Sequence, residues 1–210
     1  MKARALAAIV LLTAVGVNAF AADFATPMAR VKDSIERVVR ILKDTSLDRE
    51  ARWDGIAAVI DEGFDFRSMS QSVLATHWKE ATAEERESFT EYFSQYIEVV
   101  YRSKIEAYTD QEIRYGAETI KGDRAEVETV IVTSSAEIPV NFKLKNNDGQ
   151  WYAYDVVIEG VSLVANYRAT FQAIVKNEGM QGLLNDIQSR IEKHREELRE
   201  PGALPPPENI

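Results

Sequence analysis

The sequence predicts an α+β fold, in which several helices pack on one face of a four-stranded antiparallel meander sheet and enclose an apolar pocket. Apolar residues recur at helical spacing up to about residue 110. From there to residue 158 they alternate with polar residues, and helical spacing returns after residue 160. Helices, a run of strands and then more helix are typical of α+β proteins.

Composition points to one domain with a sizeable core. The chain has 210 residues, 45% of them hydrophobic, and no long linker or internal repeat divides it. Its formal net charge is −9 and no basic stripe interrupts the acidic surface, so nucleic acid is not expected as a partner. Because the chain has no cysteine, its stability has to come from packing.

The first 21 residues have the pattern of a secretory signal peptide. Lys2 and Arg4 form a short basic region, an apolar core follows, and Ala19 and Ala21 form a small-residue cleavage site. A membrane anchor is the alternative, but the apolar run is shorter than the roughly 18 to 20 residues of a spanning helix. We therefore expect a single domain at 22–198 and a disordered, proline-rich tail at 199–210.

Two helices and a short third one are expected before residue 80. The first has one apolar face, which consists of Val31, Ile35, Val38 and Leu42. The second is expected to begin at a capping box formed by Thr45 and Asp48 and to end at Gly63. Asp65 is expected to cap the third.

The longest amphipathic run starts at a clearer capping box, formed by Thr82 and Glu85. Its apolar face consists of Phe89, Phe93, Tyr96, Ile97, Val100, Tyr101, Ile105 and Tyr108. An ordinary core stripe has the same pattern, so this run by itself indicates burial and not a binding site.

Four strands are expected next. They are QEIRYGA, DRAEVETVIV, IPVNFKLK and WYAYDVVIEG, with the turn Asn146-Asn147-Asp148-Gly149 before the last. Alternation places Val140 and Phe142 on one face of the third strand and Asn141 and Lys143 on the other. Such strands are typical of an antiparallel sheet that is solvated on one side.

The segment YDVVIEGVSLVANYRATF (154–171) connects the last strand to another helix through an abrupt hinge. Gly160 permits the turn, and the Ser162 hydroxyl is suited to cap the helix. Asp155 and Arg168 have opposite charges on adjacent elements, and we expect a structural pair between them in preference to a catalytic role. A phosphate-binding loop would need several glycines and a lysine, which are absent here.

Catalytic and metal-binding patterns are missing from the sequence. It contains two histidines, His77 and His194, without metal-ligand spacing, and its serines have no nucleophile-elbow context. The charged residues after Arg190 are expected to be solvated, and each histidine to be a surface residue or a satisfied core residue. We therefore expect neither an enzyme nor a metal site.

Several segments together resemble the MlaC family, whose members are also known as toluene-tolerance auxiliary proteins. They are FDFRSMSQSVLATHWKEATAEERESFTEYF, IPVNFKL and, most specifically, WYAYDVVIEGVSLVANYRATF, and the resemblance covers residues 64–184. It implies a periplasmic phospholipid carrier that exchanges lipid with an outer-membrane lipoprotein complex and an inner-membrane ABC transporter carrying an MCE-domain subunit. The lipid is then cargo, and no other cofactor is implied. Ala75 departs from the pattern, because the family is expected to have a glycine there.

A carrier needs an apolar pocket, since a 16-carbon chain exposed to water costs on the order of 12 kcal/mol. We predict a pocket lined by Met69, Val73, Phe93, Tyr96, Ile97, Val100, Tyr101, Tyr115, Val127, Val140, Phe142, Leu144, Tyr154, Val156, Leu163, Tyr167 and Phe171.

Three alternatives remain open. In the first, the cargo is a hopanoid-related or other amphipathic lipid. In the second, the protein is a cone-shaped α+β enzyme of the nuclear transport factor 2-like kind. Such an enzyme needs a carboxylate or histidine of raised pKa inside the pocket, for which Asp155 is the candidate. The third alternative is a structural periplasmic adaptor with a filled core.

Overall fold

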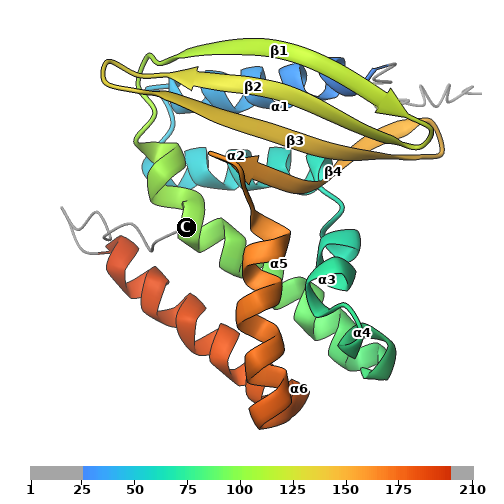
Figure 1. Cartoon of the computed structure of the whole chain (residues 1–210). Coiled ribbons are helices and arrows are strands. Elements are labelled where there is room, and N and C mark those ends of the chain that lie inside the picture. The colour runs from blue at the N-terminus through green and yellow to red at the C-terminus, as the bar shows by residue number, and fades with distance from the viewer. Residues whose placement is uncertain (1–25, 200–210) are drawn as a thin grey trace, which may run out of the picture.

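The computed structural model describes residues 26–199, which form six helices and a five-stranded sheet (Figure 1). The order is α1 (Pro27–Leu42), α2 (Arg49–Gly63), α3 (Phe66–Leu74), α4 (His77–Glu80), α5 (Ala83–Glu106), β1 (Glu112–Lys121), β2 (Arg124–Val132), β3 (Glu137–Asn147), β4 (Gln150–Ile158), β5 (Val161–Ser162) and α6 (Leu163–Arg199). The expected signal peptide, and the proline-rich tail apart from Arg199, lie outside the described residues. Among those described, no helix has the length and apolar character needed to cross a bilayer.

The sheet confirms the predicted antiparallel meander. Its strands lie in the order β1-β2-β3-β4-β5, and each neighbouring pair is antiparallel. The prediction of four strands missed β5, because two residues are too short to show alternation.

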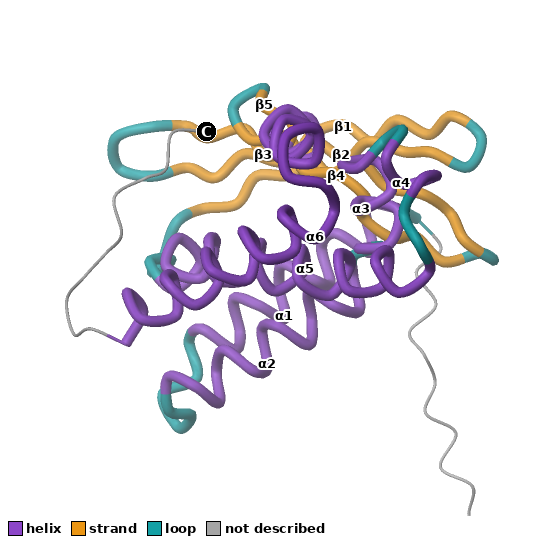
Figure 2. The backbone as a smooth tube through the Cα atoms, turned by 90° about the horizontal axis from the view of Figure 1, so that it is seen from below, coloured by secondary structure: helices purple, strands orange, loops and turns teal. Residues whose placement is uncertain are grey.

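One face of this sheet is covered by α1, and we call it the inner face. Val31 of α1 packs there against Ala125, Val127, Leu144 and Trp151, and these five residues form the sheet cluster. In the view from below, α1 and α2 lie side by side in the lower part of the picture, on one side of the strands (Figure 2).

A second apolar core, the helical cluster, lies among α3, α4, α5 and α6. Its buried members are Met69, Val73, Leu74, Trp78, Phe89, Phe93, Tyr96, Val99, Val164, Tyr167, Phe171, Leu183, Leu184, Ile187, Ile191 and Leu198. The expectation that the charged residues after Arg190 are solvated is confirmed for most of them. Ile191, His194 and Leu198 recur at helical spacing and are buried, while the charged residues between them remain largely exposed.

Most predicted helix ends are confirmed. Thr82 and Glu85 form the capping box of α5, and Asp65 caps α3 by accepting a hydrogen bond from the amide of Ser68. The capping box expected at Thr45 is wrong, because Asp48 is itself the N-cap of α2. Its carboxylate accepts a hydrogen bond from the amide of Ala51 at 2.8 Å.

Candidate functional site

The hinge between β4 and α6 is built around one buried carboxylate. Asp155 is only 4% exposed, and it accepts hydrogen bonds from the Ser162 hydroxyl at 2.7 Å and the Val164 amide at 3.1 Å. The Lys143 ammonium lies 3.2 Å from the same carboxylate. Ser162 also caps α6 as predicted, by accepting a hydrogen bond from the Ala165 amide.

The predicted pair between Asp155 and Arg168 is wrong. Arg168 donates from Nε to the carbonyl oxygen of Ser72 at 2.7 Å and so fixes α6 to α3. Asp155 instead satisfies an amide in the first turn of α6, where backbone donors lack helical partners and a negative charge is favoured. Gly160 has a φ of 85°, which confirms the predicted turn.

The predicted pocket residues fall into two groups, of which the first belongs to the helical cluster. Met69, Val73, Phe93, Tyr96, Tyr167 and Phe171 are buried members, and Ile97, Val100 and Tyr154 pack against them. The rings interlock closely: the Phe93 centroid lies 5.6 Å from that of Tyr167 and 6.1 Å from that of Phe171.

The second group lies on the inner face of the sheet. Directly paired residues of neighbouring strands point to the same side, so the register assigns Tyr115, Val127, Val140, Phe142, Leu144 and Val156 to this face. The two predicted residues outside both groups are Leu163, buried at the start of α6, and Tyr101, half-buried on α5.

Along β2, β3 and β4, cover over the inner face decreases. Ala125, Leu144 and Ala153 form one row across these strands, and each is at most 6% exposed. The edge strand β1 does not follow this gradient, because Ile120, which pairs with Ala125, is 49% exposed. Two rows further along, Tyr115, Val140 and Ile158 are only half-buried, whereas Thr129, between Tyr115 and Val140, is still 2% exposed. The next row consists of Ile113, Ile131 and Ile138, all half-buried as well.

The helix over this face shows the same gradient. Val31 near the start of α1 is buried, whereas Ile35, Val38 and Leu42 are half-buried. Lys43, just after α1, forms an ion pair of 2.9 Å with Asp110, just before β1. The sparsely covered end of the inner face is therefore the end where α1 finishes and β1 begins. A run of partly exposed Val, Ile and Tyr side chains is the kind of surface that marks a ligand groove or an interface.

The site prediction omitted Ile113, Ile131, Ile138 and Ile158. Strand alternation was able to find all four, since each has the same parity as a predicted lining residue of its own strand: Ile113 with Tyr115, Ile131 with Val127, Ile138 with Val140 and Ile158 with Val156. The register adds that Ile113, Ile131 and Ile138 lie in one row, which a single sequence does not show.

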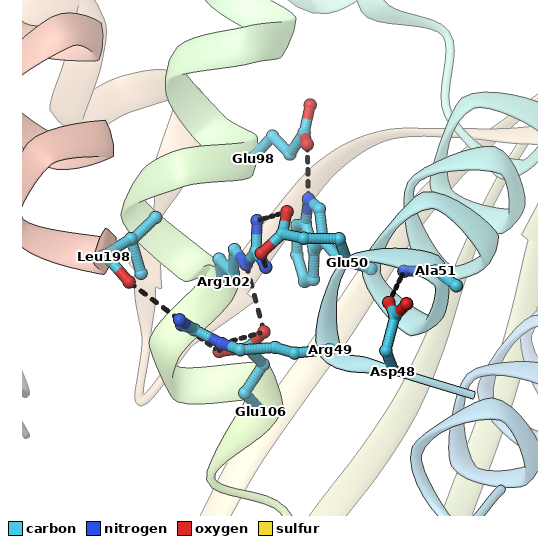
Figure 3. A network of polar contacts seen from close by, with 9 residues as sticks. Asp48, Arg49, Glu50, Ala51, Glu98, Arg102, Glu106 and Leu198 are labelled. Carbon is cyan, nitrogen blue, oxygen red and sulfur yellow. Dashed lines mark hydrogen bonds and ion pairs between the residues drawn. The ribbon is translucent and has the colours of Figure 1, made fainter. Parts of the chain in front are cut away.

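A polar network where α2 begins and where α5 and α6 end was not predicted (Figure 3). Arg102 of α5 contacts Glu50 of α2 at 2.7 Å and Glu106 at 3.0 Å. Arg49 of α2 contacts Glu106 at 2.7 Å and donates to the carbonyl oxygen of Leu198 at the same distance. Hydrogen bonding from Arg102 lowers the pKa of Glu50 below its ordinary value. The network ties α2, α5 and the end of α6 together.

Within residues 26–199, no group of three or more His, Cys, Asp or Glu side chains is arranged to hold a metal ion. Each histidine contacts a nearby glutamate: Nδ1 of His77 lies 2.9 Å from Glu80, and Nδ1 of His194 lies 3.1 Å from Glu197.

These observations define a class of α+β protein in which one face of the sheet is apolar and partly uncovered. The buried carboxylate at its hinge has a structural role. The chain belongs to the MlaC family, because the pattern of the MlaC protein family matches residues 32–189.

Curated relatives agree with this assignment. The chain is 30% identical over 122 residues to the intermembrane phospholipid transport system binding protein MlaC of Haemophilus influenzae, covering 55% of this chain and 57% of that protein. It is 24% identical over 145 residues to the toluene tolerance protein ttg2D of Pseudomonas putida, covering 68% of this chain and 65% of that protein. The chain thus spans about three fifths of the length of these relatives.

A solved structure confirms the fold. The phospholipid-binding protein from Ralstonia solanacearum, determined in complex with a phospholipid, superimposes with a TM-score of 0.72. The match covers 80% of this chain and 97% of the other, at 19% sequence identity.

Proposed function

We propose that this protein is a periplasmic phospholipid carrier, which holds acyl chains against the inner face of its sheet. The observation that carries this proposal is the gradient of burial along that face, from Leu144 to Val140 and Ile138. A folded chain gains little by leaving a row of aliphatic side chains half-covered, unless another apolar surface covers them. The names of the relatives and of the structural neighbour support phospholipid as that surface.

The energetics of lipid transfer fit a binding protein without catalysis. Each buried methylene contributes about 0.8 kcal/mol, so the water-exposed acyl chain is the main barrier between two membranes. An apolar surface removes most of this cost, and exchange with a membrane complex then runs near energetic balance. No covalent step is required.

The predicted lining residues have different roles in this proposal. Tyr115, Val140 and Phe142 are half-buried on the inner face and contact the acyl chains directly. Ile97, Val100, Tyr101 and Tyr154 are also half-buried and line its helical side. The remaining predicted residues are almost fully buried and support the walls: Met69, Val73, Phe93, Tyr96, Val127, Leu144, Val156, Leu163, Tyr167 and Phe171.

The proposed route runs between an outer-membrane lipoprotein complex and an inner-membrane ABC transporter with an MCE-domain subunit. Residues 1–21 would direct the chain across the inner membrane and then be removed. The sequence has no nucleotide-binding motif, so the direction of transport would be set by these partners.

Native mass spectrometry of protein purified from the periplasm without detergent tests this function. We expect a mass increment of one phospholipid, with fragmentation identifying its class, and uptake of labelled phospholipid from liposomes by the delipidated protein. A hopanoid or another amphipathic lipid as the main increment would replace the phospholipid assignment. Repeated empty preparations that also take up no lipid would refute the carrier.

A further inference from the structure

A pocket lies where α2 begins and α6 ends, and we call it the α2–α5–α6 pocket. Its volume is about 550 Å³, and its lining consists of Arg49, Glu50, Trp53, Glu98, Val99, Arg102, Arg195, Leu198 and Arg199. Four of these residues are arginines and two are glutamates. The lining is therefore locally positive in a chain whose formal net charge is −9.

The two arginines from α2 and α5 are already neutralised. Arg102 forms ion pairs with Glu50 and Glu106, and its guanidinium lies 5.0 Å from the centre of the Trp53 ring. Arg49 forms an ion pair with Glu106 and a hydrogen bond to the carbonyl oxygen of Leu198 (Figure 3). These contacts hold Arg49 and Arg102 in place and neutralise their charges. The two arginines therefore shape the pocket but attract a further anion only weakly.

The two arginines from α6 differ in this respect. Arg195 donates to the side-chain oxygen of Gln95 at 3.0 Å. Among the described residues, neither Arg195 nor Arg199 has a carboxylate within ion-pair distance. Both are exposed, and their spacing of four residues places them one above the other on the same side of the helix.

Two like charges at this spacing repel each other slightly, and an anion bound between them would relieve that repulsion. A guanidinium presents paired N–H donors that match two oxygens of a phosphate group. The Trp53 ring and Val99 provide an apolar wall beside the two arginines, and the Glu98 carboxylate, which accepts a hydrogen bond from the Trp53 indole, lies in the same lining. The pocket therefore combines unneutralised donors with space for a small organic group.

We propose that the α2–α5–α6 pocket binds a phosphate ester, with Arg195 and Arg199 holding the phosphate oxygens and the organic part lying against Trp53. This site differs from the acyl-chain site, because none of its lining residues is among those proposed to line that site, although both sites use residues of α5. A lipid headgroup and a soluble phosphate ester share this chemistry.

Calorimetric titration of the folded chain from residue 22 with glycerol 3-phosphate, and binding to phosphatidylglycerol vesicles, test the proposal. The double variant Arg195→Gln with Arg199→Gln should weaken binding at least about tenfold, since each lost charge-assisted hydrogen bond has a substantial effect. The matched control is Lys176→Gln with Lys193→Gln, which removes the same charge from exposed positions of α6 outside the pocket. The control should bind like the parent.

The two arms distinguish the sources of the ligand. Arginine-dependent binding in solution alone identifies a soluble phosphate ester, and arginine-dependent binding to vesicles identifies a headgroup. Co-purified lipid should be the same in the parent and in the double arginine variant. The proposal is overturned if the parent binds neither probe, if the arginine variant binds like the parent, or if the lysine control loses as much affinity.

Discussion

The carboxylate of Asp155 joins three parts of the molecule at the residue scale. It binds the Ser162 hydroxyl, the Val164 amide and the Lys143 ammonium, so it fixes β3, β4 and the first turn of α6 relative to one another. Both of its oxygens have donors in the structure. A general base needs a free oxygen facing a substrate, and the hydrogen bonding of this residue favours a structural role instead.

Replacing Asp155 with asparagine tests that role. The amide keeps one acceptor oxygen but removes the charge opposite Lys143 and places an NH₂ group where an acceptor is needed. We expect a loss of about 1.5 to 3 kcal/mol in the free energy of unfolding, with the lipid bound per folded molecule unchanged. Asp148→Asn, in the exposed turn between β3 and β4, is the control and should be close to neutral. A stable Asp155→Asn protein without lipid would contradict the structural role.

Ala75 shows backbone strain at the end of α3. Its φ is 50° and its ψ is −114°, a conformation that glycine adopts without a steric penalty and alanine does not. Ala75→Gly should therefore raise the free energy of unfolding by about 1 kcal/mol and the melting temperature by roughly 2 to 4 °C. Ala107→Gly, at a helix end with an ordinary φ of −74°, should not stabilise the protein. Denaturant titration of both variants decides this, and a destabilised Ala75→Gly would refute the account.

At the scale of elements, α6 is the part that connects the sheet to the helical cluster. Val164, Tyr167 and Phe171 of its first arm and Leu183 and Ile187 of its second arm all belong to that cluster. A break at Gly179, with φ 73° and ψ −179°, separates the arms. The break lets the second arm turn back along α5 (Figure 1).

Two glycine-to-alanine changes should have opposite effects on stability. Gly179→Ala forces a side chain into a backbone region that is nearly restricted to glycine, and it should cost about 1 to 3 kcal/mol. Gly55→Ala lies inside α2, where the new methyl group meets Ile41 at an ordinary contact distance of 3.4 Å. It should stabilise the protein by up to about 1 kcal/mol. Equal effects of the two changes in thermal unfolding would show that the break is not required.

Local patterns predicted the elements well, because helical and strand periodicity and side-chain caps are local in sequence. They did not predict the break at Gly179, since the apolar stripe continues on both sides of it. The predicted partner of Asp155 was also wrong, because the pairing with Lys143 depends on the register of β3 and β4, which is not local in sequence. Strand alternation correctly placed Val140 and Phe142 on the same face of β3, but sequence alone gave no measure of how unevenly that face is covered.

At the scale of the whole molecule, burial divides the apolar residues into two kinds. The helical cluster has closely packed rings and nearly complete burial, as expected for a core that holds the fold together. Along β2, β3 and β4 the inner face is buried at one end and half-covered at the other. The central claim is that this second surface, and not the helical cluster, holds the acyl chains.

The most direct test compares arginine at two neighbouring positions of β3. Val140 lies on the inner face, whereas Asn141 points to the opposite face, where its side chain donates to Glu126. The measurement is circular dichroism together with lipid extracted per folded molecule. Val140→Arg should remain folded, since Val140 is only half-buried. It should lose its lipid at least roughly tenfold because acyl chains exclude an unpaired charge. Asn141→Arg should keep both fold and lipid. A folded Val140→Arg protein with normal lipid, or one that fails to fold while Asn141→Arg folds, would contradict the claim.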